Sequence, residues 1–118
     1  MPNPVTHFEI IGKDAIALQK FYAEVFDWRL GPPMVEMGNY SLITPEPRGI
    51  GGGIGAGDPR VTFYIEVGDP QACLDQINRL GGKTLMPATT ITKGVTIALF
   101  QDPAGNTVGL TRSNPERT

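Results

Sequence analysis

The sequence predicts an α+β fold made of two tandem modules, about residues 5–56 and 60–112, in a single domain. The main observation is an internal repeat, because Val61–Gly82 aligns without a gap on Thr6–Asp27. Each copy runs from an alternating apolar segment, through an aspartate, into a stripe of apolar residues at helical spacing. With 118 residues, the chain is long enough to bury one core without covalent staples.

The composition is that of an ordinary globular protein. A net charge of −2 gives no electrostatic reason to expect a nucleic acid or membrane partner. The first ten residues lack the basic and apolar regions of a signal peptide, and no run of about eighteen apolar residues occurs, so we expect a cytoplasmic protein. The single cysteine, Cys73, lies on a predicted helical stripe and is expected to be a small buried hydrophobe.

The first module is predicted to open with a strand over Val5–Ile11 whose faces alternate. We expect Thr6, Phe8 and Ile10 under the following helix, and Val5, His7, Glu9 and Ile11 on the other face. Asp14 is predicted to cap that helix, which ends at Asp27-Trp28-Arg29. Its buried stripe is predicted to be Leu18, Phe21, Tyr22 and Val25.

Three short strands are predicted next, over Met34–Met37, Tyr40–Thr44 and Gly49–Ile54, with a hairpin turn at Gly38-Asn39. The glycine run at 49–55 invites comparison with a phosphate loop. Such a loop needs a lysine and a helix directly after it, and Gly57-Asp58-Pro59 follows instead. We therefore interpret the run as a strand that leaves open floor for a ligand or another backbone.

The second module repeats this order, beginning with a strand over Val61–Val67 that places Thr62, Tyr64 and Glu66 opposite its helix. Asp69 and Pro70 predict the helix start, and the stripe is Cys73, Leu74, Ile77 and Leu80. Of four later segments we expect three to form strands: Lys83–Leu85, Thr89–Thr92, Val95–Phe100 and Thr107–Thr111. Residues 113–118 are predicted to be a flexible tail.

Four motifs over about residues 5–111 together resemble the vicinal oxygen chelate superfamily, the group of glyoxalase I, bleomycin-resistance proteins and extradiol dioxygenases. They are His-x-x-Ile from His7, Phe-Tyr-x-x-Val-Phe-x-Trp over 21–28, Leu-Gly-Gly over 80–82, and Asp-Pro-x-Gly-Asn over 102–106. The resemblance implies two βαβββ modules whose mixed sheets curve into a cup, with the helices outside and a ligand cleft inside.

In metal-dependent members of that superfamily, four side chains hold a divalent ion. The resemblance carries those positions to His7, Gly53, Thr62 and Gly109 of this sequence, and only His7 is a strong ligand. It therefore implies a member with a degenerate metal site, and we expect no metal or other cofactor. Glu9 and Glu66, on the predicted face of His7, could instead complete a metal site or serve as acid–base groups. The simpler interpretation is that Glu9 pairs with a neighbour and Glu66 is solvated.

The leading functional hypothesis is a glyoxalase-like or bleomycin-resistance-like protein that binds a small organic molecule in the cup without the superfamily's metal. The predicted cleft residues are His7, Glu9, Gly53, Thr62, Tyr64, Glu66, Thr96, Ala98, Phe100 and Gly109. The alternative is a lyase or isomerase that acts on a small carbonyl compound through His7, Glu9 or Glu66, with or without a divalent metal. A structural or regulatory role is a third possibility.

Trp28 and Tyr40 either line the cleft mouth or pack elsewhere. A half-cup exposes apolar floor and a strand edge, so we expect a homodimer.

Overall fold

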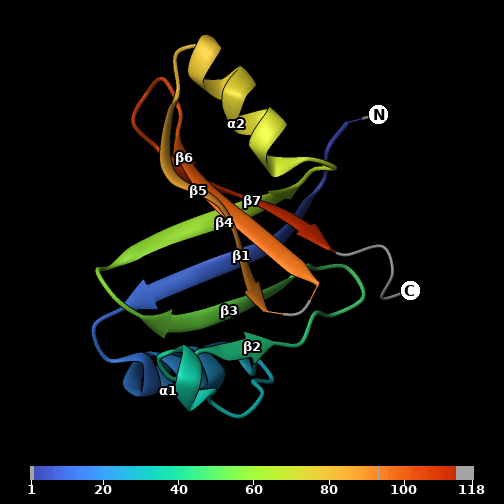
Figure 1. Ribbon diagram of the computed structural model, residues 1–118. Coiled ribbons are helices and arrows are strands. Elements are labelled where there is room, and N and C mark those ends of the chain that lie inside the picture. The colour runs from blue at the N-terminus through green and yellow to red at the C-terminus, as the bar shows by residue number, and fades with distance from the viewer. Residues whose placement is uncertain (1, 93, 114–118) are drawn as a thin grey trace. The chain divides into compact units, whose positions relative to one another are not determined.

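The computed structural model describes residues 2–92 and 94–113, and their α+β architecture agrees with the sequence prediction (Figure 1). The chain divides into two compact units. The first unit is Thr6–Thr62, and the second unit is Phe63–Thr118 together with Met1–Val5. Among the described helices, none is both long and apolar enough to cross a membrane.

The first unit is a short sheet with one helix on its face. Its elements are β1 (Val5–Gly12), α1 (Ala15–Phe26), the 3-10 helix η1 (Val35–Met37), β2 (Ser41–Ile43), β3 (Gly51–Ala56) and the start of β4 (Arg60–Glu66). The strand β3 lies between its two partners, parallel to β1 and antiparallel to β2. Figure 1 shows α1 beside this sheet, against β3.

The helix α1 begins and ends as predicted, but it is rotated from the predicted stripe. The Asp14 carboxylate accepts from the Ala17 amide at 3.1 Å, which caps the first turn. Leu18 and Tyr22 pack on the core formed by Ile10, Ile43 and Ile54, whereas Phe21 and Val25 are 55% and 56% exposed. The prediction that these last two are buried is wrong. The inward arc of the helix is instead completed by Ala15 and Gln19.

The predicted strand at Met34–Met37 is also wrong, because most of it forms η1. The Met37 amide donates to the Met34 carbonyl and the Gly38 amide to the Val35 carbonyl, at 3.0 and 3.2 Å. These local bonds replace a strand ladder. Gly38 and Asn39 both have positive φ, as a tight turn requires, and Met34 then pairs with Tyr40 in an isolated bridge.

The second unit contains most of β4, the helix α2 (Pro70–Arg79), and three later strands, as predicted. These are β5 (Lys83–Thr92), β6 (Val95–Gln101) and β7 (Thr107–Ser113). The two candidate segments at 83–85 and 89–92 are one strand, whose register shifts on either side of Met86. The sheet order is β4-β7-β6-β5, with β4 parallel to β7. Residues 114–118 of the predicted tail lie outside the described residues.

The core of the second unit lies between α2 and the sheet. Leu74 is fully buried there, and Cys73 and Ile77 pack beside it, but Leu80 is 70% exposed, contrary to the predicted stripe. The strand β6 presents Ala98 and Phe100 to this core. Their assignment to the ligand cleft is therefore wrong. The residues of β6 alternate between two faces as predicted, but Ala98 and Phe100 lie on the face that packs against α2.

Candidate functional site

In the first unit, the side chain of Tyr40 packs over Gly53 and Gly55 of β3, on the sheet face opposite α1. A Cβ atom at Gly53 would overlap the hydroxyl end of Tyr40, and a Cβ at Gly55 would come within 2.6 Å of its ring. Both glycines are therefore needed for the ring to lie so close to β3. The glycine-rich strand was predicted to leave an open floor, and instead the Tyr40 side chain covers it.

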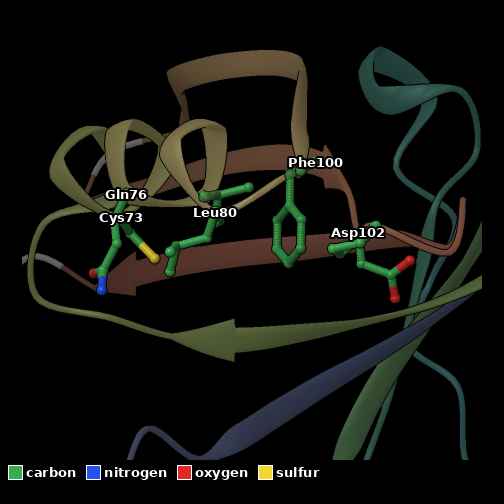
Figure 2. Close-up of a pocket in the computed structure, with 8 residues that line it drawn as sticks. Cys73, Gln76, Leu80, Phe100 and Asp102 are labelled. Atoms are coloured by element: carbon green, nitrogen blue, oxygen red, sulfur yellow. The ribbon is translucent and has the colours of Figure 1, made fainter.

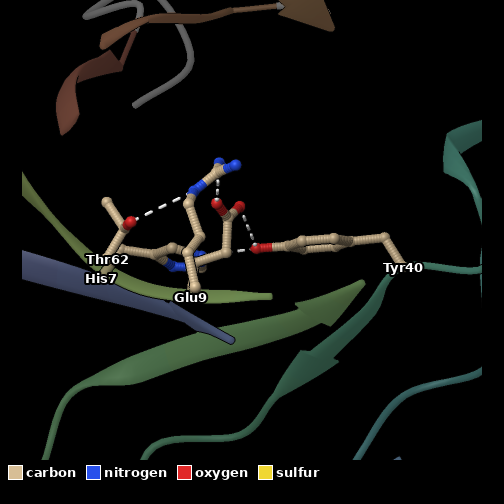
Figure 3. Close-up of polar contacts among 5 residues, drawn as sticks. His7, Glu9, Tyr40 and Thr62 are labelled. Carbon is tan, nitrogen blue, oxygen red and sulfur yellow. Dashed lines mark hydrogen bonds and ion pairs between the residues drawn. The ribbon is translucent and has the colours of Figure 1, made fainter. Parts of the chain in front are cut away.

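A continuous chain of polar contacts starts from the Tyr40 hydroxyl (Figure 3). The hydroxyl donates to Glu9 Oε2 at 3.0 Å and lies 3.1 Å from His7 Nε2. The other oxygen of Glu9 accepts from Arg60 Nη2 at 3.1 Å, and Arg60 Nε donates to Thr62 Oγ1 at 3.2 Å. We call these five residues the polar chain: His7, Tyr40, Glu9, Arg60 and Thr62. It joins three of the predicted cleft residues with Tyr40, for which the cleft mouth was one of two alternatives, and with Arg60, which was not predicted.

The hydrogen-bond directions in the polar chain fix the tautomer of His7. The Tyr40 hydroxyl has one proton and gives it to Glu9, so the bond between Tyr40 and His7 must be donated by His7 Nε2–H. Burial lowers the pKa of His7 below its ordinary value, and the nearby Glu9 carboxylate, which raises the pKa, does not reverse this. The imidazole is therefore neutral at pH 7, with its proton on Nε2.

A cavity of about 300 Å³ adjoins the polar chain at His7. Its walls combine apolar side chains with the backbone of β2 and β3, and its lining residues are His7, Leu42, Ile43, Thr44, Pro45, Gly51 and Gly52. The imidazole is the only ionisable group among these lining residues. The cavity therefore suits a molecule with an apolar body and a polar group directed toward the polar chain.

The four positions that the resemblance assigns to metal ligands offer few side-chain ligands for a divalent ion in the described residues. Gly53 has no side chain to ligate a metal, and the hydroxyl end of Tyr40 covers it. The Thr62 hydroxyl is engaged by Arg60, and the carboxylate of Glu9 is paired with the same guanidinium. No group of three or more His, Cys, Asp or Glu side chains that could hold a metal occurs within residues 2–92 and 94–113. A cation placed beside Glu9 would have to displace the positive charge of Arg60.

The remaining predicted cleft residues lie in the second unit. Tyr64 is buried and pairs with Gly109, and a Cβ at Gly109 would overlap the Tyr64 ring. Glu66 is half-buried on the same strand as Tyr64. The hydroxyl of Thr96 lies 3.2 Å from that of Thr90 on β5, so a cross-strand hydrogen bond accounts for this side chain.

A second cavity, of about 240 Å³, lies beside α2 in the second unit and is mainly apolar (Figure 2). Figure 2 shows Cys73 and Gln76 of α2, and Leu80 directly after this helix, on the same side of the cavity as Phe100. Burial raises the pKa of the Cys73 thiol, which makes it less nucleophilic at neutral pH. The Asp102 carboxylate accepts from the amides of Ala104 and Asn106 within its own turn. The polar chain is therefore the stronger candidate site.

Sequence reasoning missed Arg60 and did not assign Tyr40 to the site. The signal for Arg60 was available, because it precedes Thr62 by two residues and so shares its strand face. The predicted strand began one residue too late, at Val61, and excluded it. Tyr40 carried a weaker signal, since an aromatic side chain packs well over glycines in a neighbouring strand, but nothing in the sequence aligned it with Gly53.

Comparisons with known proteins identify relatives and a shared fold. No family model matches the chain. The protein named "Putative glyoxylase CFP32" of Mycobacterium bovis is 32% identical over 113 residues, which cover 86% of this chain and 42% of that protein. The protein of the same name from Mycobacterium tuberculosis gives the same values. The chain thus spans less than half the length of the curated relatives it matches.

Solved structures with the same fold cover nearly the whole chain at low identity. Methylmalonyl-CoA epimerase from Mycobacterium tuberculosis has a TM-score of 0.72 at 15% identity, over 96% of this chain and 89% of that one. A glyoxalase/bleomycin resistance protein/dioxygenase superfamily member from Vibrio splendidus 12B01 has a TM-score of 0.68 at 13% identity, over 95% and 100%. At these identities the similarity concerns the fold alone.

Proposed function

Because the chain belongs to the vicinal oxygen chelate superfamily, we propose that it binds a small organic molecule through hydrogen-bonding side chains in place of a metal ion. The observation that supports this proposal is the polar chain. Tyr40 stands over Gly53, which the resemblance assigns to a metal-ligand position, and Arg60 pairs with the Glu9 carboxylate. Such a site offers fixed hydrogen-bond partners beside an apolar cavity, as small-molecule sites usually do.

Ligand screening by NMR tests this proposal. We expect small molecules with an apolar body and one polar group to shift the signals of His7 and Leu42 saturably. The substitution Tyr40→Phe should weaken that binding, because it removes the hydroxyl that joins His7 to Glu9. Tyr22→Phe is the matched control, since Tyr22 packs on the helix side of the same sheet. A diverse library that shifts neither signal would refute the proposal.

The proposed absence of a metal has its own test. We expect elemental analysis of the purified protein to find no stoichiometric divalent metal. Of the four positions that the resemblance assigns to metal ligands, only His7 is a strong ligand. Near one equivalent of nickel, zinc, iron or manganese, lost in the variant His7→Asn, would contradict this. In that case Glu9 would have to exchange its pairing with Arg60 for the metal.

Acid–base catalysis on a small carbonyl compound is the second candidate function, and the neutral state of His7 favours it. A general base must be unprotonated before it accepts a proton, and the Tyr40 hydroxyl connects His7 to the Glu9 carboxylate. Exchange of α-protons of small keto acids in D₂O, followed by proton NMR, tests for this activity. Exchange that is faster than in buffer and is lost in His7→Gln would establish catalysis. Glu66 would be examined by Glu66→Gln in the same assay.

We further propose that the chain is a homodimer. The support is the apolar surface of α1, where Phe21, Val25 and Phe26 are each more than half exposed. Light scattering at micromolar concentration should give about twice the chain mass of 12.7 kDa. A mass near one chain would exclude ligand sites built from two copies.

A further inference from the structure

We infer that the ligand of the first unit is a small organic carboxylate and that Arg60 binds its charged oxygens. This inference rests on the proposed function, because it names the chemistry of a molecule bound at the polar chain. It assigns a role to a residue that the superfamily resemblance does not mark.

Arg60 is held in place by two neighbours. Its Nε donates to Thr62 Oγ1 at 3.2 Å and its Nη2 to Glu9 Oε1 at 3.1 Å. A planar guanidinium bonded to two separate residues has a defined orientation. A ligand that binds it therefore does not bear the full entropy cost of ordering a long side chain.

The rest of the guanidinium is available for binding. Arginine has five N–H groups, and the hydrogen bonds of Arg60 use two of them. Within the part of the chain that the structure describes, the other three donate to no residue. The Arg60 side chain is 36% exposed, so a molecule from solvent can reach these donors.

The chemistry of those donors selects for a carboxylate. Two adjacent N–H groups match the two oxygens of a carboxylate, whereas a neutral amide or ketone offers one acceptor oxygen. The negative charge of Glu9 offsets the positive charge of Arg60, so the pair has little net charge. It therefore attracts an anion from a distance less strongly than an isolated arginine would. The preference for carboxylates must therefore come from paired hydrogen bonds more than from long-range attraction.

Propionate and propionamide provide a matched pair of probes, since they have the same shape and differ in charge. The full-length, ¹⁵N-labelled chain would be titrated with each, and the Nε–H signal of Arg60 would be identified by its loss in Arg60→Lys. We expect propionate to shift this signal saturably and to bind about tenfold more tightly than propionamide. Arg60→Lys keeps the positive charge beside Glu9 and should weaken propionate binding by about tenfold or more.

Arg79→Lys, at the end of α2, is the control variant and should bind propionate like the unaltered chain. Circular dichroism and thermal melting would verify that both variants fold. Equal affinities for the two probes, or unchanged propionate binding in folded Arg60→Lys, would overturn the inference.

Three further outcomes distinguish failure of this inference from failure of the proposed function. If neutral molecules bind at the His7 cavity and propionate does not, the proposed function stands and the role of Arg60 is refuted. If inorganic phosphate binds more tightly than propionate and displaces it, the carboxylate assignment is refuted. If no molecule of either kind binds, both proposals fail.

Discussion

The two units of this chain place different side chains on the same backbone arrangement. In the first unit Glu9 pairs with Gly53 across parallel strands, and in the second Tyr64 pairs with Gly109 in the same way. Each glycine lies under a tyrosine ring, but Tyr40 reaches Gly53 from the region before β2, whereas Tyr64 is itself the strand partner of Gly109. The first unit thus keeps a carboxylate at the position that an aromatic ring fills in the second.

The two helices differ in a similar way, because α1 has a polar side chain at a position where α2 has an apolar one. In the gapless alignment of the repeat, Gln19 of α1 corresponds to Leu74 of α2. Leu74 is fully buried in an apolar core, while Gln19 is 7% exposed and donates to the carbonyls of Asn39 and Ile54 at 2.7 and 2.9 Å. The second unit is therefore stabilised mainly by apolar packing, and the first unit also relies on buried hydrogen bonds that hold the loop before Tyr40.

The largest effect is expected from Leu74→Ala. Truncating a fully buried leucine should lower the free energy of unfolding by about 2–5 kcal/mol. Leu18→Ala should cost about 1–2 kcal/mol, because Leu18 is only half-buried in the first unit. Urea denaturation of both variants measures this difference. Equal costs would show that the two helices bury their leucines alike, and an unchanged midpoint for Leu18→Ala would contradict the placement of α1.

Adding a methyl group to each covered glycine tests the difference between the two tyrosine–glycine pairs. Gly109→Ala should cost about 1–3 kcal/mol, because the new Cβ would meet the buried ring of Tyr64 from Cγ outward. Gly53→Ala should cost less, since the Cβ meets the hydroxyl end of Tyr40, which can move. It should nevertheless break the contact between Tyr40 and His7. If Gly53→Ala leaves the His7 signals unchanged in NMR spectra, Tyr40 does not lie over this glycine.

Gln19→Leu is a test of whether the first unit could adopt the packing of the second. We expect it to destabilise the chain by about 1–3 kcal/mol, because the carbonyls of Asn39 and Ile54 would lose their donor. The reverse exchange, Leu74→Gln, places an amide in an apolar core and should cost more. Thermal denaturation of both variants provides the measurement. A stabilised Gln19→Leu protein would show that the hydrogen bonds of Gln19 contribute little.

The sequence was sufficient to predict the elements that depend on local signals. The Asp14 and Asp69 caps, the alternation of β1, and the three strands after α2 follow from short-range chemistry and were confirmed. The rotation of a helix depends on its partners. Phe21 and Val25 fit an apolar stripe as well as Leu18 does, and only the packed sheet decides which of them is buried.

The candidate site was partly predictable for a similar reason. His7 and Glu9 of one strand and Thr62 of another were assigned to the same sheet face by alternation, and the structure links them through hydrogen bonds with Tyr40 and Arg60. Tyr40 comes from a segment whose path depends on η1, a local structure that resembled a strand in the sequence. Ala98 and Phe100 were placed on the wrong face because alternation separates two faces but does not identify which one a helix covers.

The smallest expected effect is a dependence of stability on pH between 5 and 7, which we assign to His7 in the first unit. His7 is the one histidine of the chain, and its pKa in the folded state is lowered, mainly by burial. The unfolded chain, with a histidine pKa of about 6.5, therefore binds this proton more readily than the fold does. The stabilising contribution is present above about pH 6.5 and is lost as the pH falls from there through the folded pKa.

An NMR titration of the imidazole gives the folded pKa directly, and Glu9→Gln should lower it further by removing the carboxylate that raises it. Hydrogen exchange between pH 5 and 7, corrected for intrinsic rates, should show β1 and β3 losing protection on acidification more than β6 and β7. A folded pKa at or above the unfolded value, or equal losses of protection in both units, would contradict this assignment of the pH effect to His7.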